Sequence, residues 1–165
     1  MAFFNCNIKN VYITDIAAWC NIKFEDNPLY YDTNLYLNGL LVTDLIFPDS
    51  VTHINDYAFY GCSSLISVTI PDSVTSIGYS AFSGCSKLTN ATIGENVTYI
   101  GHGAFNGYKL ESITFENPEN WYVVVQENVV ASSGIAVDSE DLSDPAKAAE
   151  LLTQTYCDKY WKRAE

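Results

Sequence analysis

The stretch VTIPDSVTSIGYSAFSGCSKLTN at residues 68–90 decides the fold, because the chain repeats it on both sides. The copy before it is LIFPDSVTHINDYAFYGCSSLIS at residues 45–67, and the copy after it is ATIGENVTYIGHGAFNGYKLES at residues 91–112. A short strand at 113–115 closes the series. A fixed period of about 20 to 50 residues is typical of a solenoid, in which each repeat forms one coil of a stack.

Each copy combines a strand with two further apolar anchors. Alternate residues of a strand face opposite sides, so Val68 and Ile70 are predicted to point inward while Ser67 and Thr69 point outward. The Pro-Asp-Ser segment that follows favours a turn. Because every anchor recurs one period away, like residues should stack in columns, and the stack as a whole is the folding unit. The two clearest columns are Val51, Val74 and Val97, and Phe59, Phe82 and Phe105.

The repeat also resembles a known family. Leu65-x-x-Val68-x-Ile70 has the spacing of a leucine-rich repeat. The phrase IPDSVTSIGYSAFSGCSKL resembles the BspA-like (Treponema-type) leucine-rich repeat, with Pro-Asp-Ser-Val-Thr, Ile-Gly, Ala-Phe and Gly-Cys at the family's spacings. The resemblance is strong over 45–116, and both flanks look like segments that accompany such repeats. It implies a surface or secreted interaction protein, often associated with adhesion, and it brings no catalytic residues.

We therefore expect a β-rich α/β fold, a leucine-rich repeat solenoid of about four rungs. A chain of 165 residues is expected to form one domain. Residues 1–44 should form an N-terminal cap with a hairpin, 45–117 the repeats, and 118–165 a C-terminal cap with a terminal helix.

The N-terminal cap should contain a short helix and the hairpin. Thr14 is predicted to cap the helix, with Asp15 in its first turn. Trp19 and Phe24 should cover the open end of the stack. Asn38-Gly39 favours a type I′ turn between two strands within 35–42.

The C-terminal cap should begin with strands at 121–125 and 135–137, separated by a turn. Asp144-Pro145 is a favourable helix start, with Asp as the cap and Pro at the first helical position. The spacing of Ala148, Leu152, Tyr156 and Tyr160 predicts an apolar helix face that packs on the cap.

Charge narrows the choice of partners. The chain carries 8 basic and 20 acidic residues, for a net charge of −12, which argues against nucleic acid and anionic membranes. A run of about 18 apolar residues is absent from the sequence, so no membrane-spanning helix is expected. Nor is a signal peptide visible, which leaves an intracellular protein or an excised piece of a secreted one. The resemblance favours a secreted or cell-surface protein.

The cysteines favour packing over chemistry. Cys62 and Cys85 occupy the same position in successive repeats, which is compatible with a disulfide or with half of a metal site. No C-x-x-C pair accompanies them, and small thiols pack well in a repeated interior column, so we expect reduced, buried cysteines.

Catalytic signals are weak. His53 and His102, the two histidines, fall at different positions of the repeat, so stacking does not align them. An acidic column of Asp49, Asp72 and Glu95 follows the strands, where a solvated rim is expected; weak calcium binding is the alternative, although the glycine-rich calcium repeat is missing. Motifs for hydrolases, metalloproteases and nucleotide binding are also missing. We predict no enzyme activity, no cofactor and no metal site.

The best binding candidates lie on the outward face of the strand ladder, which we expect to be concave. They form two columns, the first of Asp44, Ser67, Asn90 and Ser112 and the second of Ile46, Thr69, Thr92 and Thr114. Solenoids commonly bind through such a face, although short hydroxyl side chains are also ordinary strand formers that face water.

Three function classes remain open from the sequence. The first is a protein-binding or adhesion module for a host or matrix protein. The second is a carbohydrate-binding module whose cap tyrosines stack on sugars, and the third is a structural spacer of a longer surface protein. The cap tyrosines are Tyr30, Tyr31, Tyr36, Tyr122, Tyr156 and Tyr160. Neither the ligand nor the oligomeric state follows from the sequence.

Overall fold

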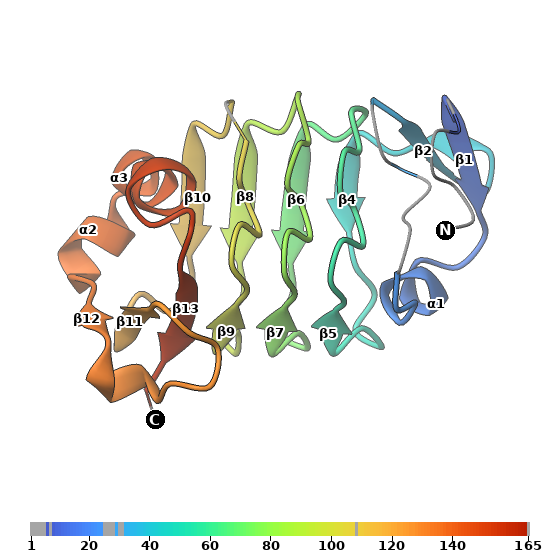
Figure 1. Cartoon of the computed structure of the whole chain (residues 1–165). Coiled ribbons are helices and arrows are strands. Elements are labelled where there is room, and N and C mark those ends of the chain that lie inside the picture. Colours follow the sequence, from blue (N-terminus) through green and yellow to red (C-terminus); the bar gives the residue numbers. More distant parts are fainter. Residues whose placement is uncertain (1–5, 7, 25–28, 30–31, 108, 165) are drawn as a thin grey trace.

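The coils stack side by side and build two separate sheets, as the computed structural model shows for residues 6, 8–24, 29, 32–107 and 109–164 (Figure 1). The first sheet is a four-stranded parallel ladder with one strand per coil. Its strands are β4 (Asp44–Ile46), β6 (Ser67–Ile70), β8 (Asn90–Ile93) and β10 (Ser112–Phe115).

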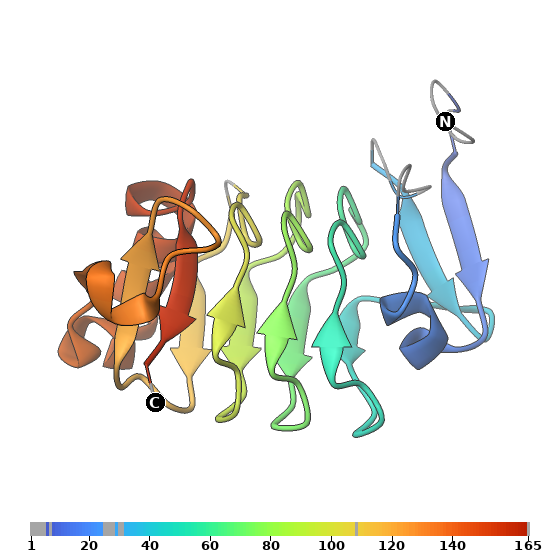
Figure 2. The same cartoon turned by 60° about the horizontal axis from the view of Figure 1, so that its bottom comes forward.

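The second sheet contains two-residue strands that the sequence analysis treated only as apolar anchors. These are β5 (His53–Ile54), β7 (Ser76–Ile77) and β9 (Tyr99–Ile100), which pair in parallel from coil to coil. Strands of two residues leave no alternation long enough to be read as a strand pattern. The two sheets form opposite walls of the stack (Figure 2).

The interior columns predicted from the period are confirmed. Phe82 lies between Phe59 and Phe105, with ring centroids 5.3 and 5.2 Å away and rings within 6° and 13° of parallel. Backbone bonds join the coils beside these rings, with Phe59 N donating to Ala81 O at 2.8 Å and Phe82 N donating to Ala104 O at 2.7 Å. The valine column is buried as well. Together these features make the fold a leucine-rich repeat solenoid.

The buried cysteines belong to the same interior. Cys62 and Cys85 are both free thiols in the core, and the Cys85 thiol donates to Phe59 O at 3.2 Å. The prediction of packed, reduced cysteines is confirmed for these two positions.

A three-stranded sheet precedes the repeats. It consists of β1 (Asn10–Ile13), β2 (Asn34–Leu37) and β3 (Leu40–Leu41). The predicted hairpin joins β2 and β3, and Asn38 and Gly39 both have the positive φ of a type I′ turn, at 51° and 82°. The parallel pairing of β1 with β2 was not predicted, because the paired residues of the two strands lie more than twenty residues apart in the sequence.

The first helix, α1, spans Ile16–Cys20, and the prediction that Thr14 caps it is wrong. Asp15 is the cap, because its carboxylate accepts from the backbone N–H groups of Ala17 and Ala18 at 2.8 and 3.0 Å. Trp19 is buried against the stack, where its indole Nε1 donates to Ala58 O at 2.8 Å. Phe24 packs on it with the ring centroids 5.0 Å apart, so the predicted cover over this end is confirmed.

Past the last coil the chain adds strands to the second sheet. β11 (Trp121–Val124), β12 (Ile135–Ala136) and β13 (Tyr160–Arg163) are antiparallel, and β13 lies between β11 and β9. The predicted strands at 121–125 and 135–137 are confirmed to within one residue, and the 3₁₀ turn η1 (Ala131–Ser133) separates them.

The helices of this region are α2 (Ser139–Ser143) and α3 (Pro145–Glu150), followed by a π-helical turn, η2 (Leu151–Thr155). Asp144 caps α3 as predicted, and α3 packs on β10. The predicted helix face that extends to Tyr160 is wrong. The helix ends at Thr155, because the chain turns there to bring Trp161 into the core on β13. The division of the chain into two caps and a repeat array stays a prediction.

Candidate functional site

The outward residues of the first ladder stand in register. β4, β6 and β8 align Asp44 with Ser67 and Asn90, and β10 adds Ser112 to the same column. Two residues further along each strand, the pairing aligns a second column in the same way, which consists of Ile46, Thr69, Thr92 and Thr114. All eight side chains are exposed or half-buried, whereas the residues between them are buried. The structure therefore brings together all eight candidate residues as two columns on one surface; whether they bind a ligand stays a prediction.

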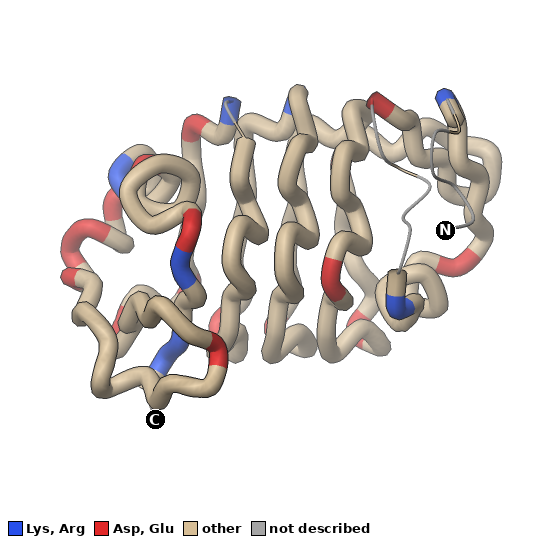
Figure 3. The backbone as a smooth tube through the Cα atoms, viewed as in Figure 1, with Lys and Arg blue, Asp and Glu red and all other residues tan. Residues whose placement is uncertain are grey.

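Charge on this ladder is concentrated at its N-terminal end. Ser67 Oγ donates to Asp44 Oδ1, and Thr43 Oγ1 donates to Asp44 Oδ2 at 2.9 Å. These two hydrogen bonds, the one from Ser67 first, lower the pKa of the Asp44 carboxyl. Along the rest of the coils most of the tube is uncharged, and Lys and Arg lie mainly in the loops and the terminal segments (Figure 3). The ladder thus offers hydroxyl and amide groups, one carboxylate and one exposed apolar side chain, Ile46.

The acidic column at the turns has a structural use. Asp72 Oδ1 accepts from the backbone N–H of Glu95 in the next coil at 2.8 Å, so this carboxylate joins two turns. Burial, together with the charge of Asp72, raises the pKa of the nearby Glu116 carboxyl. No group of three or more candidate metal ligands lies close together among the described residues.

The histidines lie apart, as predicted. His53 is on β5, whereas His102 follows β9 and stacks on Tyr79, with the centroids 5.3 Å apart and the rings 11° from parallel. The ring centroid of Tyr160 lies 5.7 Å from the centroid of the same imidazole.

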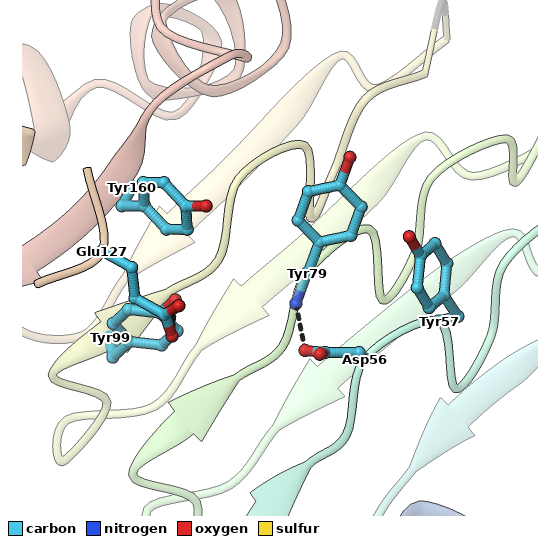
Figure 4. Close-up of a pocket in the computed structure, with 6 residues that line it drawn as sticks. All are labelled: Asp56, Tyr57, Tyr79, Tyr99, Glu127 and Tyr160. Atoms are coloured by element: carbon cyan, nitrogen blue, oxygen red, sulfur yellow. Dashed lines mark hydrogen bonds between the residues drawn. The ribbon is translucent and has the colours of Figure 1, made fainter. Parts of the chain in front are cut away.

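A second cluster of polar and aromatic side chains lies on the second sheet's side of the stack (Figure 4). It is a pocket of about 180 Å³ whose walls are two carboxylates and four phenol rings. Its residues come from three coils, from the loop after β11 and from β13: Asp56, Tyr57, Tyr79, Tyr99, Glu127 and Tyr160. Three of the four tyrosines belong to the repeats, so the sequence analysis, which considered cap tyrosines, missed this cluster.

The 23-residue spacing of the repeats indicates part of this pocket. Asp56, Tyr79 and His102 occupy one position of the repeat, and Tyr57 immediately follows the first of them. Applying the 23-residue spacing to aromatic residues as well as to aliphatic ones would have placed Tyr79 beside Asp56. Tyr160 and Glu127 could not be found this way, since they lie outside the repeats.

Tyr57 holds a backbone conformation that suits glycine better. Its φ is 60°, and the same position of the next two coils is occupied by Ser80 at 50° and Gly103 at 68°. A left-handed conformation costs a residue with a side chain roughly 1–2 kcal/mol. Such strain often accompanies functional sites, where it fixes a side chain. Here it places the Tyr57 ring 5.2 Å from that of Tyr79, at an interplanar angle of 60°.

The tyrosines proposed for sugar stacking are dispersed. Tyr30 and Tyr31 lie outside the described residues. Tyr36 stacks on Tyr12 at 4.6 Å, and Tyr156 packs against Trp161 at 6.0 Å. Of the four that the structure describes, Tyr160 alone lines the pocket of Figure 4.

With the repeat geometry established, comparison with known proteins places the chain. Residues 30–129 match the BspA type leucine rich repeat region, in six copies. The chain belongs to the BspA-type leucine-rich repeat family. No curated protein matches it.

A solved structure of a T. pallidum leucine-rich repeat protein matches this BspA-type chain at 31% sequence identity and a TM-score of 0.30. The match covers 48% of the present chain and 36% of the other. Among the described residues, the helices are all too short or too polar to cross a membrane.

Proposed function

We propose that this BspA-type chain is a non-catalytic protein-binding module that acts at a bacterial cell surface and recognises its partner with the ladder of β4, β6, β8 and β10. The observation that carries the proposal is the register of the eight outward side chains. Rungs of a sheet lie about 4.8 Å apart, so the two columns form a regular grid of hydrogen-bonding groups. An extended polypeptide can meet such a grid with its own backbone and side chains, and stacked repeats commonly bind proteins across such faces.

Membership of the family supports an interaction role. BspA-type proteins are often surface-associated, which supports the proposed surface location. The ladder has few of the aromatic and Arg side chains that dominate protein interfaces. Ile46, which is 72% exposed, is its one large apolar group. We therefore expect moderate affinity per module, and gains from repetition of the module or from a second contact surface.

The test is a binding screen on immobilised matrix proteins, mucins and glycans. The wild type is compared with the variant Ser67→Arg/Thr69→Arg/Asn90→Arg/Thr92→Arg, which fills the grid with bulky cations. A second variant, Ser86→Arg/Asn106→Arg/Ser132→Arg/Thr155→Arg, makes the same charge change at exposed positions elsewhere.

Loss of a protein hit in the ladder variant alone, at an unchanged Tm, supports the proposal. A hit that survives in the ladder variant moves recognition to another surface. Binding to glycans but to no protein favours the carbohydrate alternative, and the absence of any hit favours the spacer alternative.

A further inference from the structure

The pocket of Figure 4 combines size, charge and ring geometry that fit a single cationic side chain. Its volume of about 180 Å³ is below the roughly 300–1,000 Å³ of sites that hold whole small molecules. It therefore has room for one side chain of a larger partner or for a comparably small group.

Charge in the pocket is negative. The six described residues that line it include the carboxylates of Asp56 and Glu127 and no Lys or Arg. Asp56 is held in place because its Oδ1 accepts from the backbone N–H of Tyr79 at 2.7 Å. Glu127 is held by the Tyr99 hydroxyl, which donates to its Oε1 at 3.1 Å. Burial, and then the charge of Glu127, raises the pKa of Tyr99, so its phenol keeps its proton and remains a donor.

The four rings are inclined to one another and do not form one flat platform. Tyr57 and Tyr79 are inclined by 60°, and Tyr99 and Tyr160 by 32° with their centroids 6.4 Å apart. A sugar ring stacks best on one open, flat aromatic face, whereas a cation is attracted by several ring faces that converge around it. One face of Tyr79 is already covered by the imidazole of His102, which leaves less surface for a sugar.

The chain itself shows that one of these rings accepts a cation. The ammonium group of Lys162 lies 5.9 Å from the centroid of the Tyr99 ring, within the range of a cation–π contact. This ammonium is engaged by the backbone carbonyls of Glu127 and Val129, and Lys162 does not line the pocket. The hydrogen bonds of this ammonium thus go to backbone carbonyls and not to the carboxylates of Asp56 and Glu127.

We propose that the Asp56–Glu127 tyrosine pocket binds the positively charged side chain of a lysine or arginine from a polypeptide partner. The four rings surround the alkyl stem and the cationic head, and the two carboxylates accept its hydrogen bonds. The site lies on the second sheet's wall, away from the β4–β10 ladder, so it does not depend on the ladder being the recognition face. A net charge of −12 on the chain steers basic segments toward it.

The experiment is an NMR titration of the full, isotope-labelled chain with blocked pentapeptides. The probes are Gly-Ser-Lys-Ser-Gly, its arginine counterpart, and the same peptide with norleucine or acetyl-lysine, which keep the alkyl stem without the charge. Signals of Tyr57, Tyr79, Tyr99 and Glu127 report on the pocket. We expect saturable shifts with the lysine or arginine peptide, and binding at least about ten-fold weaker for both uncharged peptides.

Variants locate the site. Asp56→Asn and Glu127→Gln should each weaken binding of the charged peptide about two- to five-fold, and Tyr79→Leu at least about three-fold. Glu119→Gln, an exposed carboxylate outside the pocket, makes the same charge change and should leave binding unchanged. The ladder variant described above should bind the peptide like the wild type.

Several results would overturn the proposal. They are equal binding of the norleucine peptide, equal losses in Glu127→Gln and Glu119→Gln, and no shift of the pocket signals at about 20 mM charged peptide, a concentration about twenty-fold above a Kd of about 1 mM. Shifts of the same tyrosine signals by glucose, galactose or N-acetylglucosamine, without shifts from the peptides, would assign the pocket to sugars instead. Asp56, Glu119 and Glu127 are exposed carboxylates, so unchanged Tm values are expected for their amide variants and separate binding from folding.

Discussion

Replacing Phe82 by alanine tests the stacking of the coils directly. The ring is 1% exposed and lies between Phe59 and Phe105 in the neighbouring coils. A buried aromatic side chain removes about 150–250 Å² from water, which at about 25 cal/mol per Å² corresponds to roughly 4–6 kcal/mol for the whole group. Alanine retains part of that burial, so we expect the free energy of unfolding to fall by about 3–5 kcal/mol. The cavity cannot close easily, because the backbone bonds from Phe59 to Ala81 and from Phe82 to Ala104 hold the coil spacing.

Urea denaturation followed by circular dichroism measures this loss. Small domains are stable by only about 5–15 kcal/mol, so Phe82→Leu is measured alongside as a milder variant, with an expected loss below about 1.5 kcal/mol. Phe24→Ala, a half-buried ring at the end of the stack, serves as the control and should cost less than Phe82→Ala. A loss below about 1 kcal/mol for Phe82→Ala would refute the column assignment, since no well-packed interior ring can be removed so cheaply.

Three further predictions concern backbone packing, thiols and charge. Gly101→Ala should lower the free energy of unfolding by about 1–3 kcal/mol in chemical denaturation, because the new Cβ would lie 2.6 Å from the Gly78 carbonyl carbon. Gly107→Ala, whose Cβ would have no atom nearer than 3.9 Å, should leave that free energy almost unchanged. Equal losses in the two variants would contradict this packing. In the native protein a thiol reagent should label Cys6 and Cys157 but leave Cys20, Cys62 and Cys85 protected until the protein unfolds. The reason is that burial raises the pKa of those three thiols, that of Cys20 to about 12. Rapid labelling of all five cysteines would be inconsistent with the buried column. Ser67→Ala should raise the pKa of Asp44 toward its ordinary value in a carboxyl NMR titration, since the Ser67 hydrogen bond is the main cause of the lowered pKa. That lowered pKa contributes stability above the ordinary carboxyl pKa and the contribution is lost as pH falls through the folded value, so the variant should also lose it; an unchanged Asp44 pKa would show that this hydrogen bond does not form in solution.

The sequence by itself determined the stack. A period of 23 residues requires like residues to meet from coil to coil, so Phe59, Phe82 and Phe105 could be placed in one column before any coordinate was known. The same period, combined with strand alternation, placed Ser67 and Thr69 on the outward face and put all eight ladder candidates in register. Both inferences work because a repeat makes long-range contacts predictable from a local rule.

Only the tertiary structure decided what happens where the period ends. The spacing of Ala148, Leu152, Tyr156 and Tyr160 suits a helix, yet Tyr160 begins a strand, because pairing β13 with β9 and β11 buries Trp161 and closes the second sheet. That one pairing also carries Tyr160 to the side of Tyr99, while the loop beyond β11 brings Glu127 to the same place. These contacts join residues with no fixed spacing between them, and a contact of that kind is set by how the whole chain packs.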